Sequence, residues 1–195
     1  MWTIDDISLR PLELEDIDIV YEWYHSNSEL SIFSSWGNSI SKSGFRARME
    51  QSIKSGPSAD LVSFGIVFKD DLVGRIMLER IDEGNRIASL GLNIGKKEIR
   101  GRGIGRIAAR IIVDYGFKAK NLEKIYGECY GFNIRAQRCL EAVGFKQEGI
   151  LRKHELHNGE RHDIYFYGLL KSDFYNHNET LFSIPNLSSI GNNNC

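Results

Sequence analysis

The chain has 195 residues, of which 42% are hydrophobic and 26% are charged, and its formal net charge at neutral pH is -1. This length suits one domain of ordinary size, and the composition is that of a globular protein with a buried core. The balanced charge gives no general attraction to nucleic acid or to anionic lipid, so we expect neither as a partner.

The start of the chain and its cysteines bear on compartment and redox state. No apolar run approaches the ~20 residues that a membrane-spanning helix needs. The opening MWTIDDISLRPLELED is acidic where a secretory signal is basic and then apolar, so we expect a cytoplasmic protein. Cys129, Cys139 and Cys195 lack both metal-ligand spacing and disulfide density, which predicts reduced thiols and no metal site. A nucleophilic cysteine would need a neighbouring base, and the sequence places none beside them.

The first part of the chain predicts two helices on either side of a polar stretch. We expect a helix from Asp16, a residue suited to the N-cap, because apolar residues then recur at helical spacing at Ile17, Val20, Tyr21 and Tyr24. Residues 25–44 are rich in Ser and Gly, and a weaker helical pattern covers residues 45–54. Polar stretches with scattered aromatic residues line pockets or form plain surface loops, and both interpretations stay open here.

The middle of the chain predicts an antiparallel sheet followed by a long helix. Strand-like runs cover residues 61–68, 72–81 and 87–94, and residues typical of turns separate them. The pattern then changes to a helical stripe that faces the core, with apolar residues at Ile104, Ile107, Ala108, Ile111, Ile112 and Tyr115.

The last third completes a mixed α/β order. It predicts a strand over residues 124–130, a helix with Ala136, Cys139, Leu140 and Val143 on one face, and a hairpin. The hairpin arms are residues 150–156 and 161–170, and the Asn158-Gly159 pair between them is typical of a tight turn. Residues 176–195 are rich in Asn and Ser and show no period, which predicts a flexible tail after a single domain over residues 1–175.

A Gly-rich basic segment, GKKEIRGRGIGR over residues 95–106, lies between a predicted strand and the long helix. Its glycines allow a sharp turn and a close approach of backbone N–H groups to a ligand, and the helix start adds unpaired donors. The segment therefore suits a pyrophosphate. It lacks the Lys-Ser/Thr ending of a P-loop, and the antiparallel strands before it argue against a dinucleotide-binding fold.

Two motifs in this region resemble a known family. Arg100, Gly103 and Gly105 match the coenzyme A pyrophosphate loop of GNAT acetyltransferases, and Asn133 with Ala136, followed by Gly144-Phe145, is similar to a second family element. The segments SLRPLELEDI and GFKQEGILRKHELHNGERHDIYFYGLL resemble the branch that contains ribosomal-protein alanine N-acetyltransferases and spermidine N-acetyltransferases. The resemblance covers about residues 6 to 174. It implies an acetyl-CoA-dependent N-acetyltransferase with a mixed, mostly antiparallel, splayed central sheet flanked by helices.

The resemblance also implies where acetyl-CoA binds. The strand before the loop would splay from its neighbour and pair with the pantetheine arm through Leu92, Asn93 and Ile94, with the backbone N–H of Leu92 or Asn93 as oxyanion donor. Asn133 would meet the pantetheine and also cap its helix, beside Ala136. The pyrophosphate would lie on the loop residues Arg100, Gly101, Arg102, Gly103, Ile104, Gly105 and Arg106.

The side chains that relatives use for proton transfer are partly missing. Ser89 stands where many relatives have Glu, and Leu140 stands where many have a Tyr acid. Glu128 is our first candidate for the base, because it shares a predicted strand face with two tyrosines, and Glu79 is the second. Tyr130 and Cys129 could compensate for the acid. A Glu paired with Arg and a Tyr in the core or pocket wall remain the structural alternatives.

The acceptor is the least determined part. By resemblance, mixed-charge residues of the hairpin border its side of the site: Arg152, His154, Glu155, His157, Asp163 and Tyr165. A polyamine would call for a dense carboxylate cluster, so we expect a peptide N-terminus or similar primary amine that attacks acetyl-CoA directly in a ternary complex. A small amine, an amino sugar or a polyamine, and a catalytically silent acyl-CoA-binding module, are the alternatives. A homodimer is left open.

Overall fold

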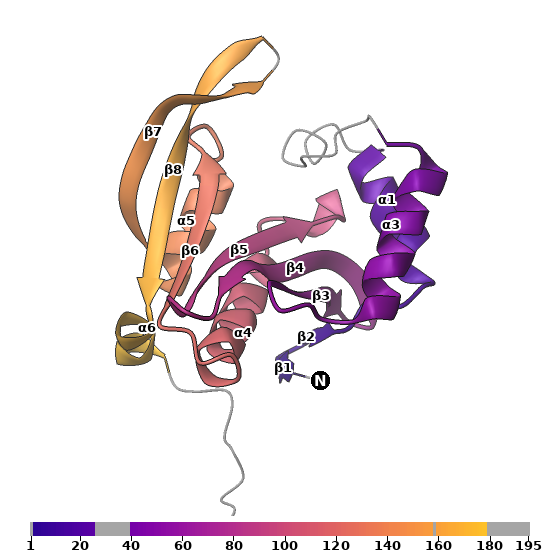
Figure 1. Cartoon of the computed structure of the whole chain (residues 1–195), viewed down its shortest axis with the longest axis horizontal. Coiled ribbons are helices and arrows are strands. Elements are labelled where there is room, and N and C mark those ends of the chain that lie inside the picture. Colours follow the sequence, from indigo (N-terminus) through magenta and orange to yellow (C-terminus); the bar gives the residue numbers. More distant parts are fainter. Residues whose placement is uncertain (1, 26–39, 158, 179–195) are drawn as a thin grey trace, which may run out of the picture.

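The computed structural model describes residues 2–25, 40–157 and 159–178 (Figure 1). Most of the polar stretch over residues 25–44 lies outside the described residues. So do Asn158 of the tight-turn pair, Cys195 and nearly all of the predicted tail.

In the described residues, eight strands form one sheet with the order β1-β2-β3-β4-β5-β6-β8-β7. Neighbouring strands are antiparallel at every step except between β5 and β6, which are parallel. The mixed, mostly antiparallel sheet is therefore confirmed. The strands are β1 (Trp2–Ile4), β2 (Ile7–Arg10), β3 (Leu61–Phe68), β4 (Asp71–Asp82), β5 (Ile87–Ile94), β6 (Lys124–Tyr130), β7 (Lys146–His157) and β8 (Glu160–Leu170).

Helices cover the sheet on both sides, as Figure 1 shows. The helix α4 (Ile104–Lys118) buries its predicted stripe, including Ala108 and Ile112, in the main core together with α5 (Ile134–Val143) and strand residues such as Ile76 and Leu78. Two further helices, α1 (Asp16–His25) and α3 (Lys42–Ser55), form a second core around Phe45 and Leu72. All four predicted helices are present.

Asp16 does not cap α1 as predicted, because it is the first residue of the helix and binds elsewhere. Its carboxylate accepts hydrogen bonds from both Nη atoms of Arg10 (2.6 and 2.9 Å) and from the backbone N–H of Glu13 (2.8 Å). Burial raises the pKa of this carboxyl, but these hydrogen bonds and the Arg10 charge outweigh burial and lower the pKa overall. The pair fastens the start of α1 to β2.

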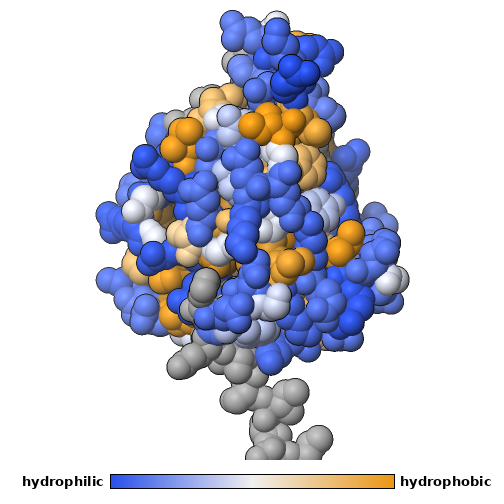
Figure 2. Space-filling model, turned by 90° about the vertical axis from the view of Figure 1, so that its left-hand side faces the viewer, coloured by the Kyte–Doolittle hydropathy of each residue, from blue (hydrophilic) through white to orange (hydrophobic). Residues whose placement is uncertain are grey.

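The hairpin of β7 and β8 extends beyond the rest of the sheet (Figure 1). His157 pairs with Glu160 across a two-residue turn, and Gly159 has φ 80°, as the tight-turn pair predicts. Figure 2 views the hairpin side: hydrophobic surface there is broken up by hydrophilic side chains, and the far end of the hairpin is hydrophilic.

A short helix at the end of the described chain, α6 (Lys171–His177), escaped the sequence prediction. Phe174 of this helix is buried against Phe117 of α4, and the Tyr175 hydroxyl donates a hydrogen bond to the buried Asp114. The helix ends two residues past the expected domain boundary at residue 175.

Candidate functional site

The parallel strands β5 and β6 separate after a short paired stretch. They pair only over Ile87–Ser89 and Lys124–Tyr126, while β5 remains paired with β4 to Ile94, and β6 with β8 to Tyr130. The two strands diverge visibly in Figure 1. The backbone of Leu92, Asn93 and Ile94 therefore has no strand partner on its β6 side, which is the splay that the resemblance implies.

Small residues let two helices close in behind the splay. A side chain on Gly127 would come within 3.3 Å of Leu140 of α5, and one on Gly105 of α4 within 3.3 Å of Leu92 and 3.7 Å of the Cys139 Sγ. Leu140 thus packs directly over Gly127, where a larger residue on β6 would collide with it.

The Gly-rich loop leads from β5 into α4 with an open surface. Gly101 and Gly103 both have φ 81°, which an L side chain rarely adopts, and nothing lies within 4 Å of a Cβ built on Gly101. Because Ile107 is the first residue of α4 with an N–H bonded back, to Gly103, the N–H groups of Ile104, Gly105 and Arg106 have no partner within the helix. A loop of this form suits an anion.

The arginines of the loop divide into two kinds. Arg100 points inward: its Nε donates a hydrogen bond to the carbonyl of Ile94 at 3.0 Å, so it braces the loop against the end of β5. Arg102 and Arg106 are exposed, and the Arg106 guanidinium would lie 3.8 Å from a Cβ on Gly103. These two arginines remain close to the open glycine surface.

Asn133 caps α5, and its side-chain oxygen accepts a hydrogen bond from the N–H of Ala136 at 3.1 Å. The predicted N-cap role is thus present. The cap leaves the amide nitrogen of Asn133 for a ligand, and Ala136 contributes its bonded N–H and a half-buried methyl group.

The sheet face opposite α4 carries the polar residues of the site. Ala88, Ile125 and Cys129 are buried in the core with α4, so alternation places Ser89, Asn93, Glu128 and Tyr130 on the opposite face. The pairing register sets further polar residues beside them, with Glu79 opposite Ser89 and Ser89 opposite Tyr126. The prediction that Glu128 shares a face with Tyr126 and Tyr130 agrees with this register.

Helix α1 joins this face through Tyr24, whose hydroxyl accepts a hydrogen bond from Asn93 Nδ2 at 3.2 Å. Burial raises the pKa of the Tyr24 phenol, against the opposing effects of Arg75 and Asn93. The side chain of Asn93 is therefore held by Tyr24, while its backbone faces the splay.

Glu128, the candidate base, forms an ion pair that the sequence did not reveal. Arg80 Nη1 lies 3.5 Å from Glu128 Oε1, and the side chains are 61% and 36% exposed. A hydrogen bond to Tyr126, followed by the charge of Glu128, raises the pKa of Arg80. No sequence signal marked Arg80, because a break in the β4–β5 register between Glu79 and Asp82 directs it.

The two candidate acids lie on opposite faces of β6. The Tyr130 hydroxyl donates a hydrogen bond to Glu155 of the hairpin at 2.5 Å, and burial with this bond raises its pKa to about 12. Cys129 is buried in the core, where burial raises the pKa of its thiol to about 11. Both groups hold their protons at neutral pH.

The six predicted hairpin residues are divided among three environments. Glu155 and His157 share the face of Tyr130, while Asp163 and Tyr165 lie on the face of Cys129. Arg152 and His154 fall in a register break of β7, where Lys153 has φ 50° and its N–H bonds to Asp163 Oδ1 at 2.7 Å.

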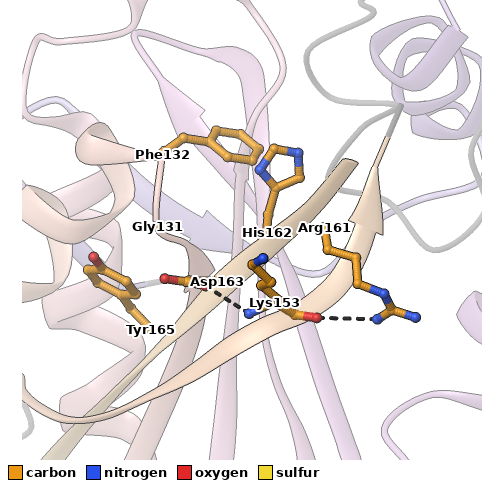
Figure 3. A pocket seen from close by; sticks show the side chains of 7 residues that line it. All are labelled: Gly131, Phe132, Lys153, Arg161, His162, Asp163 and Tyr165. Carbon is orange, nitrogen blue, oxygen red and sulfur yellow. Dashed lines mark hydrogen bonds between the residues drawn. The ribbon is translucent and has the colours of Figure 1, made fainter. Parts of the chain in front are cut away.

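A shallow hollow of about 290 Å³ lies where β6 ends beside this break (Figure 3). Phe132 and His162 make an edge-to-face contact at 4.9 Å on one side of it, and Tyr165 lies on the other. Arg161 and Lys153 add positive charge to the lining of the hollow. Phe132 is 46% exposed and stacks on Tyr130, and the sequence pattern had not singled it out.

Two structural features are absent from the described part of the chain. Among these residues, no group of three or more His, Cys, Asp or Glu side chains has the arrangement of a metal site. No helix within the described ranges combines the length and hydropathy needed to cross a membrane.

Comparison with known proteins gives a consistent result. A family model described as the acetyltransferase (GNAT) domain matches residues 6–146. The protein named "Uncharacterized N-acetyltransferase p20" of Bacillus licheniformis is 27% identical over 170 residues, which cover 86% of this chain and 94% of that protein. The spermidine N(1)-acetyltransferase of Vibrio cholerae is 31% identical over 109 residues, which cover 56% of this chain and 62% of the relative.

The fold has its own match among solved structures. The structure of RimL, titled a ribosomal L7/L12 alpha-N-protein acetyltransferase in complex with coenzyme A, superimposes with a TM-score of 0.77. The match covers 85% of this chain and 94% of that chain, at 17% identity. At this identity the likeness concerns the fold.

Proposed function

The chain belongs to the GNAT acetyltransferase family, since the family model matches residues 6–146, and from this we propose that it transfers the acetyl group of acetyl-CoA to a primary amine, with a peptide N-terminus as the acceptor. One observation carries the proposal: the unpaired edge of β5 lies next to an open, Gly-rich helix start. This pairing of features offers a backbone edge for an extended amide-bearing arm and a cradle for a pyrophosphate.

The donor site uses the residues on both sides of the splay. Leu92, Asn93 and Ile94 would bind the pantetheine arm through their backbone, and the amide of Asn133 would approach it from α5. The N–H groups from Gly101 to Arg106, with the side chains of Arg102 and Arg106, would hold the pyrophosphate. Arg100 would support this loop through its bond to Ile94.

The reaction is a direct attack in a ternary complex. The neutral amine forms a C–N bond with the acetyl carbonyl carbon, and the oxyanion receives a hydrogen bond from the N–H of Leu92 or Asn93. The tetrahedral intermediate then breaks its C–S bond and releases the thiolate of coenzyme A. Glu128 accepts the proton that the amine loses, directly or through water.

The departing thiolate needs a proton, and Leu140 occupies the place of the usual acid. An ordinary thiol has a pKa of ~8.5, so near neutral pH the sulfur takes a proton readily from water or from the amine. Tyr130 is bound to Glu155, which leaves positioning of the two substrates as the main catalytic effect.

The donor site is tested by Gly103→Val, because the side chain would strain a residue with φ 81° and obstruct the approach of the pyrophosphate. We expect titration calorimetry to show acetyl-CoA affinity at least tenfold weaker. Gly159→Val is the matched control, since Gly159 has φ 80° and open surroundings but lies in the hairpin turn. Equal affinity of a folded Gly103→Val protein and the parent would remove this site.

The acceptor is tested by a thiol-release assay with peptides, small amines, amino sugars and polyamines. Fastest turnover with a peptide N-terminus supports the proposal, and no thiol release above the uncatalysed background with any of these acceptors would indicate a catalytically silent acyl-CoA-binding module. The domain limits of 1–175 and a cytoplasmic location stay predictions from the sequence, and a homodimer stays open. Size-exclusion chromatography with light scattering measures the last of these.

A further inference from the structure

Arg80 reaches the sheet face opposite α4 that carries Ser89 and Glu128, which we call the acceptor face, because the β4 strand is distorted there. The register between β4 and β5 shifts between Glu79 and Asp82, and Arg80 has φ 52°. Left-handed backbone is unfavourable for a residue with a side chain, because the Cβ atom approaches the following carbonyl oxygen. The distortion turns the Arg80 side chain across β5 toward β6, where it meets Tyr126 and Glu128.

The contacts of Arg80 leave part of its guanidinium open. A guanidinium has five N–H donors in a planar fork that matches a carboxylate. The contacts to Tyr126 and Glu128 do not use this fork fully, because the Glu128 contact is long, at 3.5 Å, and the side chain is 61% exposed. An acid on a ligand has room to bind the same guanidinium.

The charges around this position do not suit a polycation. On the described sheet face, Arg75 and Arg80 offset the carboxylates of Glu79 and Glu128. On the hairpin, the carboxylate of Glu155 already accepts a hydrogen bond from the hydroxyl of Tyr130. A polyamine that placed one amine beside Glu128 would bring its second positive charge among arginines.

We propose that Arg80 is a specificity-determining residue, which binds an acidic group carried close to the reacting amine and thereby selects acidic peptide N-termini over polyamines. The inference rests on the proposed function and adds the chemistry of the acceptor to it. The acid of the acceptor takes the open side of the Arg80 fork, and the amine lies toward Glu128 on the other side. Each charged group of the substrate thus meets a side chain of opposite charge, the acid at Arg80 and the amine at Glu128.

The experiment uses the full chain and two peptides that differ only in charge, Ala-Asp-Ser-Trp and Ala-Asn-Ser-Trp, with spermidine as a third acceptor. We expect kcat/KM of the parent to favour the Asp peptide by at least tenfold, which is the typical effect of a hydrogen bond between charged groups. In Arg80→Gln this preference should fall to within about twofold, and in Arg80→Glu it should reverse in favour of the Asn peptide and spermidine.

Arg86→Gln is the matched control. Arg86 also has positive φ (57°) and is also ion-paired, to Glu123, but it lies at the β5 end that is far from the loop. Its substitution should keep the peptide preference. A role for Arg80 in merely holding Glu128 would slow both peptides by the same factor and leave their ratio unchanged, and that result overturns the inference.

Two further outcomes separate the inference from the proposed function. Spermidine turnover by the parent above that of the Asp peptide contradicts the inference, although acetyl transfer would stand. A parent that acetylates neither peptide contradicts the peptide acceptor, and calorimetry of the two peptides on the coenzyme A-loaded protein then decides the role of Arg80. Tighter binding of the Asp peptide, lost in Arg80→Gln, supports it, and equal binding removes it.

Discussion

Residues with left-handed backbone occur in both the donor and the acceptor half of the proposed site. Gly101 and Gly103 adopt it in the loop, where the absence of a side chain avoids strain and keeps the surface open. Arg80 and Lys153 adopt it at register breaks in β4 and β7, at the cost that a side chain brings. Positive φ at residues with a side chain is often retained at functional sites, and the acceptor face has one such residue in Arg80.

The candidate base can be tested at the residue scale. Glu128→Gln removes the proton acceptor but keeps the shape of the side chain, so we expect unchanged acetyl-CoA binding and a turnover about 100-fold lower. The loss should be largest at low pH, where more of the amine is protonated. The measurement is the pH profile of kcat.

Glu79→Gln is the companion variant for this prediction, because Glu79 lies on the same face, opposite Ser89. A turnover of Glu128→Gln within about threefold of the parent across the pH range would make Glu128 a structural partner of Arg80. If Glu79→Gln then loses the activity, the base lies on β4, two strands away from the position on β6 that we favour.

Among the elements, helix α1 is attached to the sheet at both of its ends. Its first residue, Asp16, binds Arg10 of β2, and Tyr24 near its last turn binds Asn93 of β5. The helix therefore connects two distant strands of the sheet, and it places a half-buried phenol on the acceptor face. The attachment at Asp16 helps to fix where Tyr24 lies.

Asp16→Asn tests this attachment. The substitution removes the ion pair between the buried carboxylate and Arg10, whose side chain is only 27% exposed. We therefore expect the free energy of unfolding to be about 2 kcal/mol lower at neutral pH. The folded-state pKa of Asp16 is lowered, so its contribution is present above pH ~4 and is lost as the pH falls below that value. Urea denaturation at pH 7 and at pH 3 measures both effects.

The deficit of the variant should be smaller at pH 3 than at pH 7, because protonation of Asp16 in the parent weakens the ion pair as the pH falls. A constant difference between the two proteins at pH 7 and pH 3 would instead assign the effect to packing. Glu50→Gln is a suitable control, since Glu50 makes only i,i+4 pairs within α3, to Arg46 and Lys54, and should change stability little.

At the scale of the whole molecule, buried thiols predict a loss of stability in alkali. Burial raises the pKa of Cys129 and of Cys139 to about 11 in the folded protein, above an ordinary value of about 9. A raised folded-state pKa gives stability that is present below pH 9 and is lost as the pH rises to 11, because the unfolded chain releases its protons first. We expect a loss of at least about 2 kcal/mol between these values.

Urea denaturation at pH 8.5 and pH 10.5 measures this loss. In the double variant Cys129→Ala, Cys139→Ala the stability at pH 8.5 should be lower, but its further fall by pH 10.5 should be smaller than in the parent. An equal fall in both proteins would assign the alkaline sensitivity to other groups, such as Tyr130 and Tyr167, whose pKa values are raised to about 12.

The elements of the fold followed from local patterns in the sequence. The stripe from Ile104 gave α4, the alternating apolar runs gave β3 to β5, and the Asn158-Gly159 pair indicated the hairpin. Periodicity and turn residues are local properties, so they suffice where each segment buries one side. Helix α6 escaped because its seven residues are too few for a period and it is held by tertiary contacts at Phe174 and Tyr175.

The sequence by itself determined the parts of the proposed donor site, because a glycine loop, a helix start and a helix cap lie within one continuous stretch from Gly95 to Ala136. The arrangement of the proposed acceptor side was decided only by the tertiary structure. Arg80, Glu128 and Tyr24 come from three separate elements, and a register shift and a helix anchor bring them to one face. Such distances depend on how strands pair and helices dock, which local residue patterns do not encode.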